Sequence, residues 1–213
     1  MRHKIIIITI VLFSSFELFA QDVECWLTPQ VGTSILAQDN KVKTRLGLEE
    51  DFSIAGTYGF EFGCTYKNLD MFFDFAEEHS SFKSNDKTLG ITSLTTSINF
   101  AYPFYKTEKI VFSARLGFGC FINDIKFGGK VNVVGLIDSF INSIYKQKYN
   151  IYIPIGISMQ IKQSENHSVK MGLYYRQSIE TGVTKLFGGD SVKDFPLHKL
   201  NALVFNIGYT FRI

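Results

Sequence analysis

Alternation of apolar and polar residues is the dominant pattern in this 213-residue sequence. Between residues 54 and 66, the even positions hold Ile, Gly, Tyr, Phe, Phe, Cys and Tyr, whereas the odd positions are small or polar. Side chains point alternately to the two faces of a β-strand, so this period predicts a strand between two different environments. The clearest repeat runs from Tyr149 to Lys162, where an isoleucine-rich row alternates with a row that contains Asn150, Ser158 and Gln160.

Eight such segments are predicted, at residues 25–36, 54–66, 69–76, 94–104, 110–123, 149–162, 169–179 and 203–213. Long connections at 37–52, 77–88, 124–147 and 180–199 alternate with short ones at 67–68, 106–108 and 164–166. Long loops on one rim and short turns on the other are typical of outer-membrane barrels. Within the third long connection, residues 127–130 predict a hairpin turn that extends the fifth strand. Apolar residues at helical spacing between Ile137 and Ile144 predict a short surface helix.

The first twenty residues have the layout of a secretory signal peptide. Arg2, His3 and Lys4 form a positive start, an apolar run follows from Ile5, and Ala20 provides a small residue before the expected cleavage. We therefore assign 1–20 to a signal peptide and 21–213 to one domain. No later segment approaches about 18 uninterrupted apolar residues, so a membrane-embedded chain must be a closed barrel. The predicted fold is all-β, an eight-stranded antiparallel up-and-down transmembrane β-barrel.

These features, together with the final segment from Phe205 to Ile213, resemble the small outer-membrane barrels of the porin-like or outer membrane protein A type. The bias toward Ile, Lys, Phe and Asn is similar to Bacteroidetes-type members. The resemblance implies a location in the outer membrane of a Gram-negative cell envelope, contact with outer-membrane lipid, and insertion by the barrel assembly machinery. In that family the last strand carries an assembly signal that usually ends in an aromatic residue. Tyr209 and Phe211 fit its spacing, whereas the terminal Ile213 departs from it.

Composition narrows the candidate chemistry. The net charge is +2, so no strong basic field indicates nucleic acid as a partner. Cys25, Cys64 and Cys120 form no CxxC pair and no cluster with histidines, so we expect no metal site and no cofactor. Three free, buried thiols are favoured over one disulfide with one thiol left over.

Charged residues in the polar rows are candidates for the barrel interior. If the apolar rows face lipid, the inward charges include Glu61, Asp70, Asp74, Arg115, Lys170, Arg176 and Arg212. Of these, Glu61, Asp74, Arg115 and Arg176 form the expected lumen charge network. Buried charges need partners, because an isolated one carries a severe desolvation cost. We expect the two arginines to compensate the two carboxylates across a filled lumen, since eight strands leave just enough room for side chains. The alternative is a narrow, charge-lined channel for small solutes.

Two further alternatives remain open. A lipid-modifying outer-membrane enzyme would need a histidine beside a nucleophile, and His79 precedes Ser80 and Ser81 in the second long connection. Adjacent positions in sequence are weak support for such a site, and we assign no catalytic residue. A soluble lipocalin-like binding barrel would place the apolar rows inside. Its surface rows should be rich in Lys and Glu, but they hold Gly, Ser, Thr and Asn.

Much of the charge lies instead in the first two long connections, at Lys41, Lys43, Arg45, Glu49, Glu50, Asp51, Glu77, Glu78, Lys83, Asp86 and Lys87. The favoured function is therefore a non-enzymatic outer-membrane protein with a structural or surface-interaction role through its extracellular loops. The pattern identifies no particular extracellular ligand.

Overall fold

The structure is a computed structural model. It describes residues 23–37, 52–84, 87–128, 130–133, 136–140, 143–181, 184–186 and 201–213. Eight long strands are present: β1 (Val23–Ala37), β2 (Phe52–Tyr66), β3 (Leu69–Ser84), β4 (Lys87–Lys106), β5 (Ile110–Gly128), β8 (Ser143–Lys162), β9 (His167–Thr181) and β11 (Asn201–Arg212). Three short ones are β6 (Lys130–Val133), β7 (Leu136–Phe140) and β10 (Thr184–Leu186). The predicted signal peptide, residues 1–20, lies outside the described residues. Within them, no helix has the length and apolar character needed to cross a membrane.

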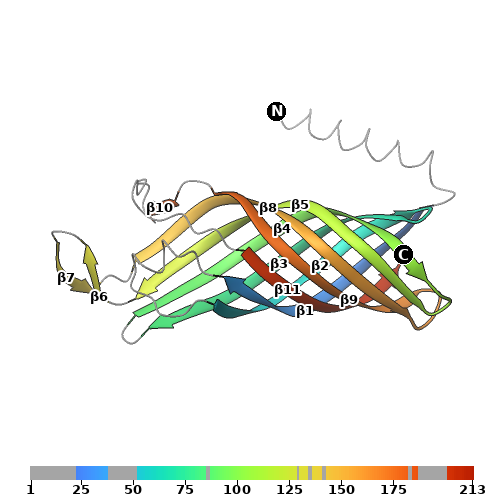
Figure 1. Cartoon of the computed structure of the whole chain (residues 1–213), viewed down its shortest axis with the longest axis horizontal. Coiled ribbons are helices and arrows are strands. Elements are labelled where there is room, and N and C mark those ends of the chain that lie inside the picture. Colours follow the sequence, from blue (N-terminus) through green and yellow to red (C-terminus); the bar gives the residue numbers. More distant parts are fainter. Residues whose placement is uncertain are drawn as a thin grey trace, which may run out of the picture.

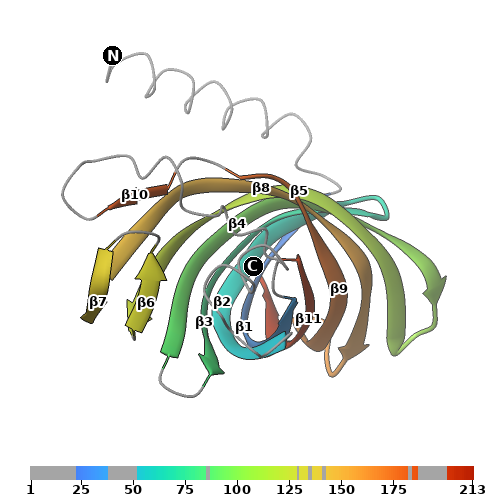
Figure 2. The same ribbon diagram turned by 60° about the vertical axis from the view of Figure 1, so that its left-hand side comes forward.

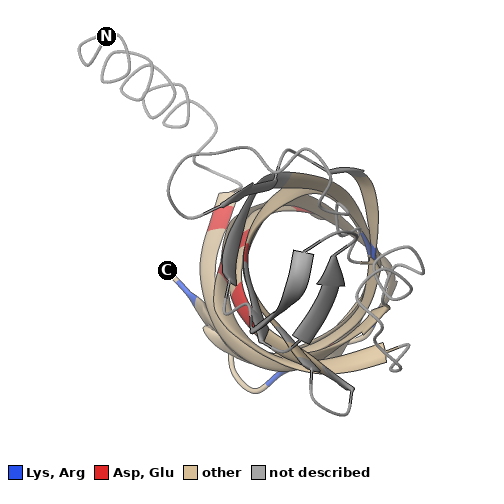
Figure 3. Cartoon of the chain, turned by 90° about the vertical axis from the view of Figure 1, so that its left-hand side faces the viewer, with Lys and Arg blue, Asp and Glu red and all other residues tan. Residues whose placement is uncertain are grey.

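The eight long strands close into one antiparallel barrel (Figure 1). Neighbours along the chain pair with each other, β8 pairs with β9, and β1 pairs with β11 to complete the wall. Viewed down its axis, the wall forms a ring (Figure 3). Closure removes the free sheet edges that would expose unpaired backbone groups. The predicted eight-stranded antiparallel barrel is confirmed.

The apolar rows face outward and the polar rows face the lumen. Ile155 is 54% exposed and Phe205 46%, whereas Ser158 is 8% and Asn206 6% exposed. The outward belt includes Leu27, Phe60, Phe73, Ile98, Leu116, Leu173 and Ile207. An apolar surface that continues around the wall indicates an apolar surrounding, as a lipid bilayer provides. The lipocalin-like alternative is therefore wrong, because it requires these rows inside.

The two ends of the barrel differ. One end, here called the short-turn end, carries the turns at residues 67–68, 107–109 and 163–166 and the end of β11. At the opposite end, here called the long-connection end, β3, β4, β5 and β8 run further than the other strands (Figures 1 and 2). These four strands have 16 to 20 residues, whereas a strand needs about 9–11 to span a bilayer. One side of the wall therefore extends beyond the thickness of a membrane.

This extension corrects two predictions. Glu77, Glu78 and Lys83 belong to β3, and Lys87 belongs to β4, because the pairing of β3 with β4 continues to Ser84. The helix predicted between Ile137 and Ile144 is wrong, because β7 ends at Phe140 and β8 begins at Ser143. Strand pairing accounts for the second difference. β7 pairs with β6, and the start of β8 pairs with β5, so these ladders supply the backbone hydrogen bonds that a helix would otherwise provide.

The prediction of three free thiols is also wrong. Cys25 and Cys64 form a disulfide that links the outer face of β1 to that of β2 near the short-turn end. The register places the two residues directly opposite each other, with a Cα–Cα distance of 4.0 Å. Cys120 is the free cysteine of the described residues.

Candidate functional site in the lumen

A buried arginine lies between two carboxylates halfway along the lumen. Arg115 of β5 donates from Nη1 to Oε1 of Glu61 on β2, at 2.9 Å, and from Nη2 to Oδ2 of Asp74 on β3, at 2.5 Å. Glu61 and Asp74 are cross-strand neighbours, so both carboxylates meet one guanidinium. All three residues are at most 5% exposed. The structure thus brings together three of the four residues that the sequence nominated.

A lysine supplies the second cation of this group. Lys170 of β9 donates from Nζ to the other oxygen of Glu61, at 2.6 Å. Two carboxylates therefore meet two cations, which removes the net charge that would make burial costly. We call Glu61, Asp74, Arg115 and Lys170 the charge layer.

Neutral polar groups complete the hydrogen bonds of the charge layer. Gln30 donates to Asp74 at 2.8 Å and accepts a hydrogen bond from Asn206 at 2.6 Å. Asn99 accepts a bond from Nε of Arg115 at 3.0 Å. Buried charges contribute to a unique structure only when their remaining donors and acceptors are satisfied in this way.

Aromatic rings surround the two cations. The Arg115 guanidinium lies 4.3 Å from the Tyr174 ring centre and 4.9 Å from that of Phe72. The Lys170 ammonium lies 4.3 Å from the Trp26 ring centre. These faces attract cations, most strongly where water is excluded. Rings and charges together fill the middle of the lumen.

Arg176 does not join this group. Its Nη2 donates to Oε2 of Glu78 at 2.7 Å, and the two side chains are only 2% and 3% exposed. The expected compensation of Glu61 and Asp74 by Arg176 is therefore wrong. Glu78 lies four residues after Asp74 in the same inward row of β3. Extending the alternation beyond residue 76 would have placed Glu78 in the lumen as a partner for an arginine.

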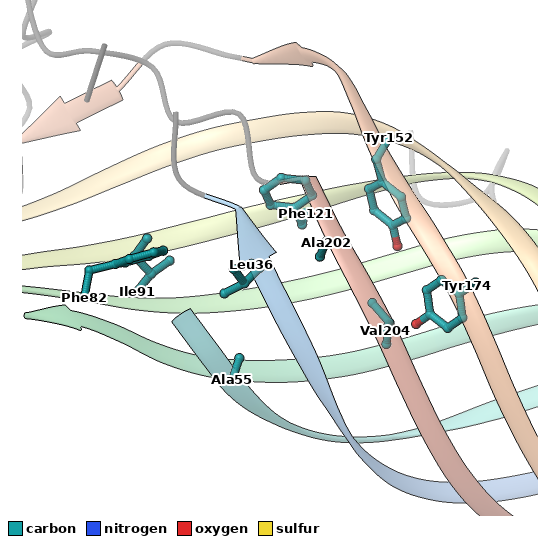
Figure 4. Close-up of a cluster of buried hydrophobic side chains, with 9 residues drawn as sticks. All are labelled: Leu36, Ala55, Phe82, Ile91, Phe121, Tyr152, Tyr174, Ala202 and Val204. Atoms are coloured by element: carbon teal, nitrogen blue, oxygen red, sulfur yellow. The ribbon is translucent and has the colours of Figure 1, made fainter. Parts of the chain in front are cut away.

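A cluster of buried apolar side chains lies further along the lumen than the charge layer, toward the long-connection end. Figure 4 shows its nine residues. Phe82 and Phe121 are 0% exposed and Tyr152 is 4% exposed. Side chains bordering a water-wide channel would retain accessible surface, so this region is packed. We call it the apolar cluster, formed by Leu36, Ala55, Phe82, Ile91, Phe121, Tyr152, Tyr174, Ala202 and Val204. The sequence does indicate this cluster, because large apolar residues such as Phe121 interrupt rows that are otherwise polar.

His79 lies on the outer face of β3 and not in a loop. Its Nε2 is 3.0 Å from Oε1 of Glu77, and its Nδ1 is 3.2 Å from Oγ1 of Thr92 on β4. The hydroxyl of Tyr58 is 3.5 Å from Nε2. Ser80 belongs to the opposite, inward row, so it is not the partner of His79. In the described part of the chain, no group of three or more His, Cys, Asp or Glu side chains is placed to hold a metal ion.

Comparison with known proteins identifies the architecture. No protein-family model matches the sequence, and no curated protein sequence matches it. Neisserial surface protein A matches with a TM-score of 0.54 and 10% identity, over 89% of this chain and 97% of that one. A major outer membrane protein from Thermus thermophilus matches with a TM-score of 0.52 and 10% identity, over 89% and 99%. The chain has the fold of the small outer-membrane β-barrels, whereas the similarity to Bacteroidetes-type members stays a prediction.

Proposed function

We propose that this protein is a non-enzymatic outer-membrane barrel with a structural or surface-interaction role through its extracellular loops. The observation that carries the proposal is the filled lumen. The charge layer and the apolar cluster occupy successive levels of it with buried side chains. A barrel closed in this way is poorly suited to passing solutes, which supports a role exerted from its ends.

The shape of the wall supports a role at the long-connection end. We place the short turns in the periplasm and the long connections outside the cell, as in other outer-membrane barrels. The extension of β3, β4, β5 and β8 then raises one side of the wall above the outer leaflet (Figure 2). Structure beyond the bilayer is available to partners without any change in the membrane-embedded part.

Biogenesis follows from the same assignment. Residues 1–20 would direct export across the inner membrane and be removed. Tyr209 and Phe211 at the end of β11 face outward with 36% and 40% exposure, and Ile213, which follows the strand, is 83% exposed. This row would be presented to the barrel assembly machinery during insertion and to outer-membrane lipid afterwards.

Epitope insertion tests the proposed orientation. A short tag placed within residues 38–51 should be labelled by antibody on intact cells. The same tag at the turn formed by residues 163–166 should be labelled only after the outer membrane is permeabilised. Labelling of the turn on intact cells, or recovery of the protein without detergent, would contradict the proposal.

Conductance tests the closed lumen. The purified full chain in planar bilayers should show no steady ion current, with protein content verified by heat-modifiable gel migration of the recovered samples. A reproducible current whose ion selectivity changes in Arg115→Ala would instead support the narrow-channel alternative.

Lipid acyl chemistry is a second candidate, favoured by the Glu77–His79–Thr92 contacts on the outer face. In such a reaction Thr92 Oγ1 attacks an ester carbonyl while His79 accepts the hydroxyl proton, and Glu77 orients the imidazole. The acyl group bonds to Thr92, the ester C–O bond breaks, and the departing alcohol takes the proton. Water then releases the fatty acid from Thr92.

Fatty-acid release from lipid vesicles containing the purified protein tests this candidate. Activity that disappears in Thr92→Val and His79→Asn but persists in Ser80→Ala would establish it. Release that is absent, or equal in all these variants, would leave the non-enzymatic proposal in place.

A further inference from the structure

A polar cavity occupies the lumen at the short-turn end. Its volume is about 490 Å³, within the range of small-molecule sites. Its lining includes the charged residues Glu24, Lys67, Asp70, Lys106, Lys162 and Arg212. We call this space the periplasmic cup, a name that rests on the proposed orientation. It is separate from the apolar cluster and lies on the other side of the charge layer.

A β-bulge places one of the cations in the cup. The pairing of β4 with β5 shifts between Pro103 and Tyr105, so Lys106 pairs with Val111 of the inward row. Without the shift, alternation would keep the even-numbered Lys106 on the outer face with Tyr102. Bulges commonly redirect a side chain beside a functional site. The wall is therefore built in a way that brings this ammonium group to the cavity.

A second lysine lies on the same side of the cup. Lys162 is in the inward row of β8, two residues beyond Gln160, and Gln160 pairs with Val111. Neither Lys106 nor Lys162 forms an ion pair with a carboxylate of the described residues. Lys106 and Lys162 thus border the cavity without an ion-pair partner among the described residues. Lys67, whose ammonium lies 5.1 Å from the Tyr66 ring centre, is a third such cation in the lining.

On the opposite side of the cup, one cation is already paired with a carboxylate. Arg212 lies 2.8 Å from Oε2 of Glu24, and Asp70 accepts a hydrogen bond from Thr65 at 2.6 Å. Asp70 keeps its negative charge, because a hydroxyl donor does not neutralise it. The charges of the lining without an ion-pair partner among the described residues are therefore those of Lys67, Lys106, Lys162 and Asp70, which leaves the cup net positive. Hydroxyl and amide groups, including that of Ser113, offer neutral hydrogen bonds between them.

The charge layer closes the inner end of the cup. A smaller space of about 20 Å³ continues from it to Lys170 and Trp26, where Lys170 is bound to Glu61. A solute that enters from the short-turn end therefore meets a buried ion pair and must leave by the same route. The arrangement favours binding over passage.

We propose that the periplasmic cup binds a small oxyanion, a carboxylate or phosphate group of a periplasmic solute, between Lys106 and Lys162. Oxyanions match this site because lysine ammonium groups form strong, charge-assisted hydrogen bonds with them. The two lysines give the site its charge, and the bulge at Pro103 fixes its geometry.

The test is titration of the purified full chain, ¹⁵N-labelled in zwitterionic detergent, with sodium succinate and separately with sodium phosphate at constant ionic strength. Backbone amide signals of Ser113, Gln160 and Lys162 should shift and saturate with at least one probe. Lys106→Gln together with Lys162→Gln should weaken binding about tenfold or more, because hydrogen bonds to charged groups are lost. Lys109→Gln removes the same charge from a nearby turn outside the cup lining and should leave the affinity unchanged.

Absence of saturable shifts with both probes would overturn the proposal, as would equal weakening by Lys109→Gln. Shifts with succinate alone identify a carboxylate site, and shifts with phosphate alone identify a phosphate site. Lys106→Arg should retain binding, which separates loss of charge from loss of fold. Because binding is measured on purified protein, it does not depend on the orientation tested by epitope insertion.

Discussion

Replacing Arg115 with methionine tests how the middle of the lumen is held together. The substitution keeps most of the side-chain length but removes the ion pairs to Glu61 and Asp74. Lys170 still compensates Glu61, so Asp74 becomes the uncompensated buried charge, with Gln30 as its remaining side-chain donor among the described residues. Removing one partner of a buried pair costs about 3–5 kcal/mol. We expect the free energy of unfolding of Arg115→Met to fall by that amount.

The measurement is urea unfolding in lipid vesicles, followed by the fluorescence of Trp26, the single tryptophan of the chain. Trp26 is 5% exposed and lies beside Lys170, so its emission reports the packed lumen. Glu24→Gln is the matched control, because the Glu24–Arg212 pair is 60% and 31% exposed and should contribute about 0–1 kcal/mol.

A second substitution makes the reasoning refutable. If the cost arises from the orphaned carboxylate, adding Asp74→Asn to Arg115→Met should recover part of the lost stability, because it removes the buried charge. A cost for Arg115→Met no larger than that of Glu24→Gln would refute the argument. So would a double variant less stable than Arg115→Met alone, since the carboxylate would then not be the destabilising group.

Three further changes in the barrel wall should lower the free energy of unfolding. Ile155→Arg on the lipid-facing row should lower the free energy of unfolding by about 2–4 kcal/mol in vesicles if it lies near the midplane. Gly156→Ala should cost about 1–3 kcal/mol in the same assay, because its Cβ would lie 2.2 Å from the carbonyl oxygen of Leu173. Gly56→Ala is the control and should be tolerated, because a Cβ there would meet nothing within 4 Å. Reducing the Cys25–Cys64 disulfide should lower the free energy of unfolding by about 3–4 kcal/mol, because it releases a loop with a sequence separation of 39. A non-reducing gel should show that the disulfide has been opened.

Alternation predicted the membrane-embedded wall well, for a physical reason. Lipid on one side and a crowded lumen on the other impose different side chains on successive residues, so the facing of Ile155 and Ser158 follows from parity alone. The short turns could also be predicted, because each separates two segments of alternating residues by only a few polar positions. Beyond the bilayer this contrast disappears. Residues 87–93 of β4 therefore gave no strand signal, although their backbone continues the ladder.

Pairing across the barrel could not be derived from parity. Whether Cys25 meets Cys64 depends on register, and a shift of one residue would place them on opposite faces. The partner of Arg176 depends on how far the strands are staggered around the closed wall, which a single sequence does not specify. Inward parity correctly selected Glu61, Asp74 and Arg115, but it could not distinguish which arginine would meet which carboxylate.

The order of the three levels in the lumen determines what a single substitution can do to permeability. An ion entering from the cup first meets the charge layer, and Arg115→Ala would open space and leave net negative charge there. The same ion would still face the apolar cluster, where Phe82 and Phe121 have no accessible surface and where Arg176, which lies over the Phe121 ring, is already paired with Glu78. Moving an unpaired charge through such a region carries a severe desolvation cost. Loss of Arg115 should therefore affect stability well before it affects conductance, and a steady current would require the apolar cluster to be opened as well.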